Sequence, residues 1–152
     1  MIFHASIEAD DPPRVAAALA RLWRAEAFAF PPVAEGSRIV LAGDTRNSAI
    51  EVYPRGTALH PTDGDPVTRP VGPAPRHGAV HLAIATPLAV QDVFDLAAEE
   101  GWLAQRRTRG GMFEVIELWI EGSFLVEVLT AEMQAQYLTT MTPGGWREAL
   151  AA

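Results

Sequence analysis

Apolar and polar residues alternate in two stretches that lie far apart in the chain. Residues 2–9, IFHASIEA, place His4 on one side of a strand and apolar residues on the other. Residues 79–85, AVHLAIA, repeat this pattern around His81. The apolar sides of both strands are expected to form the core, and their residues are Phe3, Ala5, Ile7, Val80, Leu82 and Ile84. The alternation therefore predicts two half-buried strands, each with a histidine on the side opposite the core.

Each predicted strand is followed by a helix signal. Asp11-Pro12 and Thr86-Pro87 both combine a residue that caps helix N-termini with a proline at the first helical position. Apolar residues at helical spacing follow both pairs. The first helix is expected to end before Pro31, and the second at Gly101, which suits a helix C-terminus.

Further strand patterns complete two similar halves. The predicted strands cover residues 38–42, 49–53, 103–108, 112–120 and 124–129. Each half thus reads as a strand, a helix and two or three strands, which predicts an α+β fold of two tandem βαβββ modules. Together they would form a curved mixed sheet, with helices on one side and a cupped face on the other.

One domain is expected to hold both modules. Residues 54–78 are dense in proline and glycine and show no periodicity, which is typical of a surface connector. The predicted parts of the domain are module one at 1–53, the connector at 54–78, module two at 79–130 and a helical C-terminal tail at 131–152.

Two histidines and two glutamates occupy equivalent places in this duplicated pattern. His4 and His81 lie in the first strands, 77 residues apart, and Glu51 and Glu127 lie in the last strands, 76 residues apart. Apolar neighbours flank each glutamate, so all four side chains should leave the helix-packed core and point into the cup. Two imidazoles and two carboxylates form a ligand set that suits Zn²⁺, Ni²⁺, Mn²⁺ or Fe²⁺. The alternative is that the glutamates lie on a solvated face of the sheet.

Composition narrows the chemistry further. The 152 residues contain no cysteine, so disulfides, thiolate zinc sites and cysteine nucleophiles are excluded. The net charge of −7 disfavours binding to nucleic acid and to anionic membranes. The N-terminus does not resemble a signal peptide and no apolar run is long enough to span a membrane, so a cytoplasmic location is expected.

The same alternation extends the cup. In the last hairpin, Glu117 and Trp119 should share a face with Leu125 and Glu127, and Tyr53 should face inward beside Glu51. Tyr53, Trp119, Leu125 and Leu129 would then line a small-molecule pocket. Glu117 is a candidate base, metal neighbour or arginine partner. Nearby, the run Arg106, Arg107 and Arg109 either protects a strand edge or binds an anionic substrate.

The paired βαβββ layout with histidine and glutamate on corresponding strands resembles the vicinal oxygen chelate superfamily. His4, Glu51, His81 and Glu127 match the ligand arrangement of glyoxalase I. The resemblance implies a divalent metal that bridges the two halves, within one chain or across a homodimer. It also implies a small-molecule substrate whose neighbouring oxygens chelate that metal. A turn at Glu121-Gly122 replaces the longer turn usual in this family.

For function, the resemblance implies a metal-dependent lyase, isomerase or epimerase of the glyoxalase type. The metal would polarise a carbonyl and stabilise an enediolate while a carboxylate moves a proton, with Glu127 as the favoured base and Glu51 as ligand or second base. Glu8 stands where glyoxalase I commonly has an arginine that helps to hold glutathione, which speaks against a glutathione adduct as substrate. The alternative is a non-catalytic small-molecule binder of the bleomycin-resistance type. A dioxygenase is the third choice, because a fourth ligand would crowd oxygen.

Overall fold

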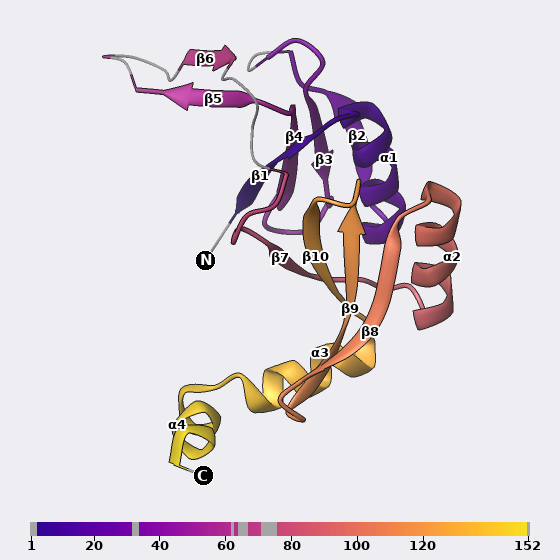
Figure 1. Cartoon of the computed structure of the whole chain (residues 1–152), viewed down its shortest axis with the longest axis vertical. Coiled ribbons are helices and arrows are strands. Elements are labelled where there is room, and N and C mark those ends of the chain that lie inside the picture. The colour runs from indigo at the N-terminus through magenta and orange to yellow at the C-terminus, as the bar shows by residue number, and fades with distance from the viewer. Residues whose placement is uncertain (1–2, 32–33, 62, 64–66, 71–75, 152) are drawn as a thin grey trace. The chain divides into compact units, whose positions relative to one another are not determined.

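A computed structural model describes residues 3–31, 34–61, 63, 67–70 and 76–151 (Figure 1). The chain divides into two compact units, Met1–His77 and Gly78–Ala152. No helix among the described residues is both long and apolar enough to cross a membrane.

The first unit contains a four-stranded mixed sheet with the strand order β1-β4-β3-β2. Its elements are β1 (His4–Ala9), α1 (Pro12–Trp23), β2 (Glu26–Ala29), β3 (Arg38–Leu41) and β4 (Ala49–Pro54). β1 and β4 run parallel, whereas β3 is antiparallel to both of its neighbours. The order strand, helix and three strands is the predicted βαβββ module.

The sequence of α1 explains where this helix begins and how it packs. The carboxylate of Asp11 accepts a hydrogen bond from the backbone N–H of Arg14, and Pro12 occupies the first helical position, as predicted. The apolar stripe of the helix is buried and packs against the sheet. Its fully buried side chains are Val15, Ala16, Ala18, Leu19 and Leu22.

The second unit repeats the module with the strand order β7-β10-β9-β8. Its elements are β7 (Leu82–Ala85), α2 (Val90–Glu100), β8 (Leu103–Arg109), β9 (Phe113–Ile120), β10 (Phe124–Leu129), α3 (Ala131–Thr140) and α4 (Pro143–Ala151). β7 and β10 are the parallel pair, which corresponds to β1 and β4 in the first unit. The predicted α+β fold class, with its tandem βαβββ modules, is therefore confirmed.

The predicted starting point of the helix in this repeat is wrong. α2 begins at Val90 after Ala89, not at Pro87, because the side chain of Asp92 supplies the cap by accepting the backbone N–H of Ala89. The hydroxyl of Thr86 instead accepts the N–H of Leu88 in the preceding turn. The predicted end of α2 at Gly101 is confirmed, since this residue adopts the left-handed conformation that favours glycine.

The predicted core positions Phe3 and Val80 are also wrong, with 57% and 72% of their surfaces exposed in the chain. Both residues precede the first residue of their strand, β1 or β7. Alternation predicts which side a residue faces but not where the packed part of a strand begins.

The predicted connector is only partly irregular. Residues 57–60 and 67–70 form a separate antiparallel hairpin, β5 (Thr57–His60) and β6 (Val67–Pro70). The hairpin joins neither four-stranded sheet. Pro70 lies at the end of its strand, a position that tolerates the missing backbone N–H.

Candidate functional site

Glu51 occupies the middle of β4 and lies opposite Ser6 of the parallel strand β1. The Ser6 hydroxyl donates a hydrogen bond to Glu51 Oε2 over 2.8 Å. The Tyr53 hydroxyl donates to the same oxygen from two residues further along β4. Two neutral hydroxyl donors therefore orient the half-buried carboxylate of Glu51 on the face opposite α1.

The environment of Tyr53 keeps its hydroxyl protonated. Burial raises the pKa of Tyr53 to about 12, and its hydrogen bond to Glu51 acts in the same direction. A phenol that stays neutral can keep donating to the carboxylate at any physiological pH. Tyr53 thus acts on Glu51 as a fixed hydrogen-bond donor.

Glu127 is the corresponding residue of β10, and its surroundings are different. It pairs in register with Glu117 of the antiparallel strand β9, so two carboxylates lie side by side. Arg109 lies between them: its Nη2 donates to Glu117 Oε1 at 2.7 Å and its Nε donates to Glu127 Oε1 at 2.9 Å. These contacts raise the pKa of the Arg109 guanidinium, mainly through the hydrogen bond to Glu127. The cluster of Arg109, Glu117 and Glu127 is held together by ion pairs in a half-buried position.

The sequence did not identify the role of Arg109 in this cluster. From the sequence, the basic run was expected either to protect a strand edge or to bind an anionic substrate. Of its neighbours in the run, Arg106 pairs with Glu114 outside the cluster, and Arg107 lies 3.9 Å from Glu117, too far for a hydrogen bond. Residues 107 and 109 have the same parity in β8 and fall on the Glu117 side of the sheet. That parity could have indicated Arg109 as the partner that Glu117 needs.

The two predicted histidines lie at the beginnings of their strands. His4 is the first residue of β1 and is exposed. His81 directly precedes β7, is also exposed, and its Nδ1 lies 3.0 Å from the carbonyl oxygen of Ala79. The prediction that His81 belongs to the strand itself is thus wrong by one residue, since the paired segment begins at Leu82.

The registers of the two units are nevertheless equivalent around these residues. Glu51 lies opposite Ser6, two residues after His4. Glu127 lies opposite Ala83, two residues after His81. In each unit, therefore, the glutamate lies opposite the residue that follows the histidine by two positions, although His4 lies within β1 and His81 directly precedes β7.

The remaining predicted pocket residues lie on the Glu127 side of the second sheet. Trp119 and Leu125 are cross-strand partners in β9 and β10, and both are half-buried. Alternation places them on the face that also carries Glu117 and Glu127. This face of the second unit thus carries an apolar pair beside the charged cluster.

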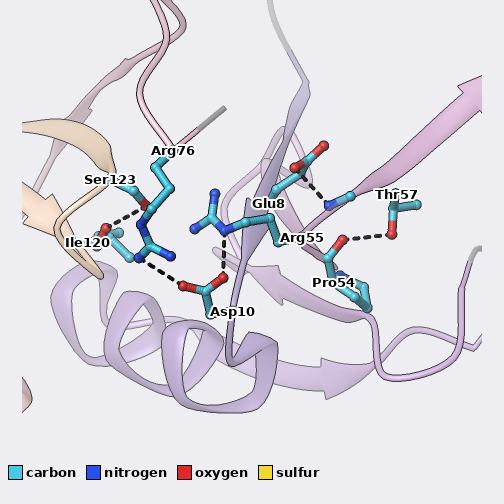
Figure 2. Close-up of polar contacts among 9 residues, drawn as sticks. Glu8, Asp10, Pro54, Arg55, Thr57, Arg76, Ile120 and Ser123 are labelled. Carbon is cyan, nitrogen blue, oxygen red and sulfur yellow. Dashed lines mark hydrogen bonds and ion pairs between the residues drawn. The ribbon is translucent and has the colours of Figure 1, made fainter. Parts of the chain in front are cut away.

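Glu8 stands where glyoxalase I commonly has the arginine that helps to hold glutathione, and here it binds the backbone of the same unit. Its carboxylate accepts the backbone N–H of Gly56 at 3.1 Å (Figure 2). Asp10, two residues further along, holds Arg55 at 2.6 Å and Arg76 at 3.0 Å. The carboxylate of Asp10, directly after β1, thus binds an arginine from each end of the predicted connector. The pKa of Asp10 is lowered mainly by its hydrogen bond with Arg55.

The donor chemistry of the predicted metal ligands fits a divalent ion. Among the described residues, one oxygen of each carboxylate, Oε1 of Glu51 and Oε2 of Glu127, accepts no hydrogen bond and remains available. The set takes one imidazole and one carboxylate from each unit. Within the described ranges, no three His, Asp or Glu side chains gather as a metal site. The four residues remain a predicted ligand set.

The sequence matches no protein-family profile and no curated protein. Solved structures do match the fold. FosX, a fosfomycin resistance protein from Listeria monocytogenes, is 15% identical with a TM-score of 0.59, and the alignment covers 91% of this chain and 96% of that one. FosX from Mesorhizobium loti is 12% identical with a TM-score of 0.55, covering 90% and 96%. An integron cassette protein from V. cholerae is 15% identical with a TM-score of 0.51, covering 86% and 94%.

At these identities the similarity establishes the fold alone. The chain has the paired βαβββ fold of the vicinal oxygen chelate superfamily, as the sequence predicted. The Listeria monocytogenes protein has also been crystallised in complex with Mn(II) and sulfate; that structure is 13% identical to this chain, with a TM-score of 0.58, and the alignment covers 91% and 96%.

Proposed function

We propose that this protein is a metal-dependent lyase, isomerase or epimerase that moves a proton next to a carbonyl of a small molecule. The observation that carries the proposal is the equivalent register of His4 with Glu51 and of His81 with Glu127. Glu51 contacts Ser6 and Tyr53 whereas Glu127 contacts Arg109, so the contacts of the two glutamates do not explain why a histidine and a glutamate recur at the same offset in both modules. A shared ligand role explains the repetition.

His4, Glu51, His81 and Glu127 would hold the ion. When bound, a divalent ion would polarise the substrate carbonyl and make the adjacent proton easier to remove. The chain itself must supply the group that accepts this proton, and both glutamates are candidates.

The contacts of the two carboxylates favour Glu51 over Glu127 as the proton acceptor. Glu51 is held by the neutral hydroxyls of Ser6 and Tyr53, so taking up a proton would break no ion pair. Glu127 is bound to the Arg109 guanidinium, and protonation would forfeit that attraction. The resemblance ranked these residues in the opposite order, with Glu127 as the favoured base.

A non-catalytic binder of the same fold is the second candidate. The ion pairs of Glu127 with Arg109 support it, because a carboxylate engaged by an arginine is a weaker metal ligand and base. In that case the cup would hold a small molecule without changing it. Neither candidate involves nucleic acid or a membrane surface, and a homodimer is the proposed assembly.

Metal analysis tests the first candidate. We expect the purified protein to contain a divalent ion, and Zn²⁺, Ni²⁺ or Mn²⁺ to raise the melting temperature of the chelator-treated protein. His4→Ala and His81→Ala should each abolish this rise, whereas His77→Ala, which changes a histidine outside the ligand set, should retain it. If no ion is bound and none of the three raises the melting temperature, the metal-dependent function is contradicted. Ligand affinity that survives in His4→Ala would support the binder.

A further inference from the structure

A pocket of about 250 Å³ lies in the second unit between the parallel strands and helix α3. Its lining residues are Ala83, Ala85, Leu129, Gln134, Tyr137 and Leu138. The first three come from β7 and β10 and the last three from α3. In Figure 1, α3 is the helix that directly follows β10.

Specific contacts fix α3 as the wall of this pocket. The Gln134 side-chain amide donates to the carbonyl oxygen of Leu129 at 2.9 Å and to that of Thr86 at 3.3 Å. These carbonyls lie at the end of β10 and just after β7, so one side chain ties the helix to both strands. The backbone N–H of Thr86 also donates to the Leu129 carbonyl, which joins the two strand ends. The pocket is therefore preformed.

Apolar contacts hold the next turn of the same helix. Met133 is fully buried, and the ring of Tyr137 packs edge-on against Phe113 of β9 with the ring centroids 5.1 Å apart. Leu138, by contrast, is 74% exposed although it borders the pocket. An apolar side chain left at the rim can close over a ligand without first breaking a contact with the core.

The pocket begins beside the candidate catalytic face. Ala83 is the strand partner of Glu127, so the two side chains share a face of the sheet. Ala85 follows on the same face, which puts the alanine floor of the pocket next to the Glu127 carboxylate. A molecule that reaches Glu127 can therefore extend directly over these alanines.

The lining selects an apolar group of limited size. Alanine and leucine make up most of it, and the amide group of Gln134 is already engaged by the two backbone carbonyls. The volume is below the ~300–1,000 Å³ of sites that enclose a whole drug-sized ligand. The pocket thus suits one part of a ligand, a short aliphatic group.

We infer that this pocket is the subsite for an aliphatic chain carried by the substrate, next to its polar reacting end. The inference rests on the proposed function for the polar end, since the vicinal oxygens would lie toward Glu127 and the metal. It assigns the substrate class as small molecules with vicinal oxygens, such as 2-hydroxy or 2-oxo acids, that carry a short aliphatic tail.

A homologous series of ligands tests the length of the tail. In the Mn²⁺-loaded protein, affinity should rise from lactate through its longer straight-chain 2-hydroxy acid homologues, by about three- to fourfold for each methylene group that becomes buried. The rise should stop when the pocket is full. Ala85→Leu should abolish the dependence on chain length, because the added side chain occupies the floor. Ala29→Leu, at an exposed strand position of the first unit, should retain it.

A second measurement on metal-free protein separates this inference from the proposed function. Titration with tert-butanol, a compact apolar probe, should shift the backbone amide NMR signals of Ala83, Ala85 and Leu129 in the wild type and in Ala29→Leu, but not in Ala85→Leu. If these signals shift but no metal raises the melting temperature, the subsite is supported and the proposed function is contradicted. An absence of shifts, or an affinity independent of chain length, would overturn the subsite. The molar mass in solution is the last readout. If Ala85→Leu changes the oligomeric state and Ala29→Leu does not, the pocket is an interface between copies of the chain, and the subsite is overturned.

Discussion

Replacing Arg109 with alanine should lower the free energy of unfolding by about 2–3 kcal/mol. The change leaves Glu117 and Glu127 facing each other as cross-strand partners without the guanidinium that bridges them. Their side chains are only 18% and 12% exposed, so water screens the remaining repulsion poorly. Breaking a fully buried pair costs about 3–5 kcal/mol, and the partial exposure of Arg109 places this case somewhat lower.

Two further variants make the Arg109 test specific. Arg106→Ala removes the same type of side chain from the same strand, but its pair with Glu114 is exposed and should cost less than about 1 kcal/mol. The double variant Arg109→Ala with Glu117→Gln removes the second carboxylate and should recover much of the loss. Denaturant unfolding measures all of these free energies. Equal losses in Arg109→Ala and Arg106→Ala would contradict the role of the charged cluster.

Stability should fall steeply between about pH 10 and pH 12, and Tyr53 should account for much of the fall. The pKa of Tyr53 is raised from 10.0 to about 12 in the folded chain, mainly by burial and then by Glu51. A raised pKa stabilises the fold fully below pH 10, and this stabilisation is lost as the pH rises through 12. Two pKa units correspond to about 2.7 kcal/mol, since one unit is about 1.36 kcal/mol.

The matched control for Tyr53 is the only other tyrosine in the chain. Tyr53→Phe should flatten the stability curve above pH 10, whereas Tyr137→Phe should keep the wild-type slope. Near neutral pH, Tyr53→Phe should cost about 1 kcal/mol, the typical value of one hydrogen bond, because the Ser6 hydroxyl still donates to Glu51. Denaturant unfolding of chelator-treated protein up to about pH 11 measures both effects. Unchanged slopes in both variants would contradict the assignment of this loss of stability to Tyr53.

Local patterns along the chain were sufficient for much of the fold. The proline after Asp11 predicted the beginning of α1, and Gly101 predicted the end of α2. The final hairpin, β9 and β10, formed around the predicted turn at Glu121-Gly122. Each of these features depends on residues within a few positions of one another, so a sequence pattern carries it.

Other elements depend on partners that are distant in sequence. β2, Glu26–Ala29, has four exposed residues and no alternation, and it is a strand because β3 offers backbone hydrogen bonds. The hairpin of β5 and β6 lies in a segment rich in proline and glycine, where a single strand has no periodic signal of its own. Neither element could be predicted from its own residues.

The sequence by itself determined the duplicated module and the faces of its strands, including the equivalent places of two histidines and two glutamates. These properties follow from side-chain alternation, which is a local consequence of strand geometry. Only the tertiary structure decided which groups touch: Ser6 and Tyr53 at Glu51, Arg109 at Glu127, and α3 over the alanines of β7. Such contacts depend on strand register and on long side chains reaching diagonally across a sheet, and no spacing along the chain encodes either.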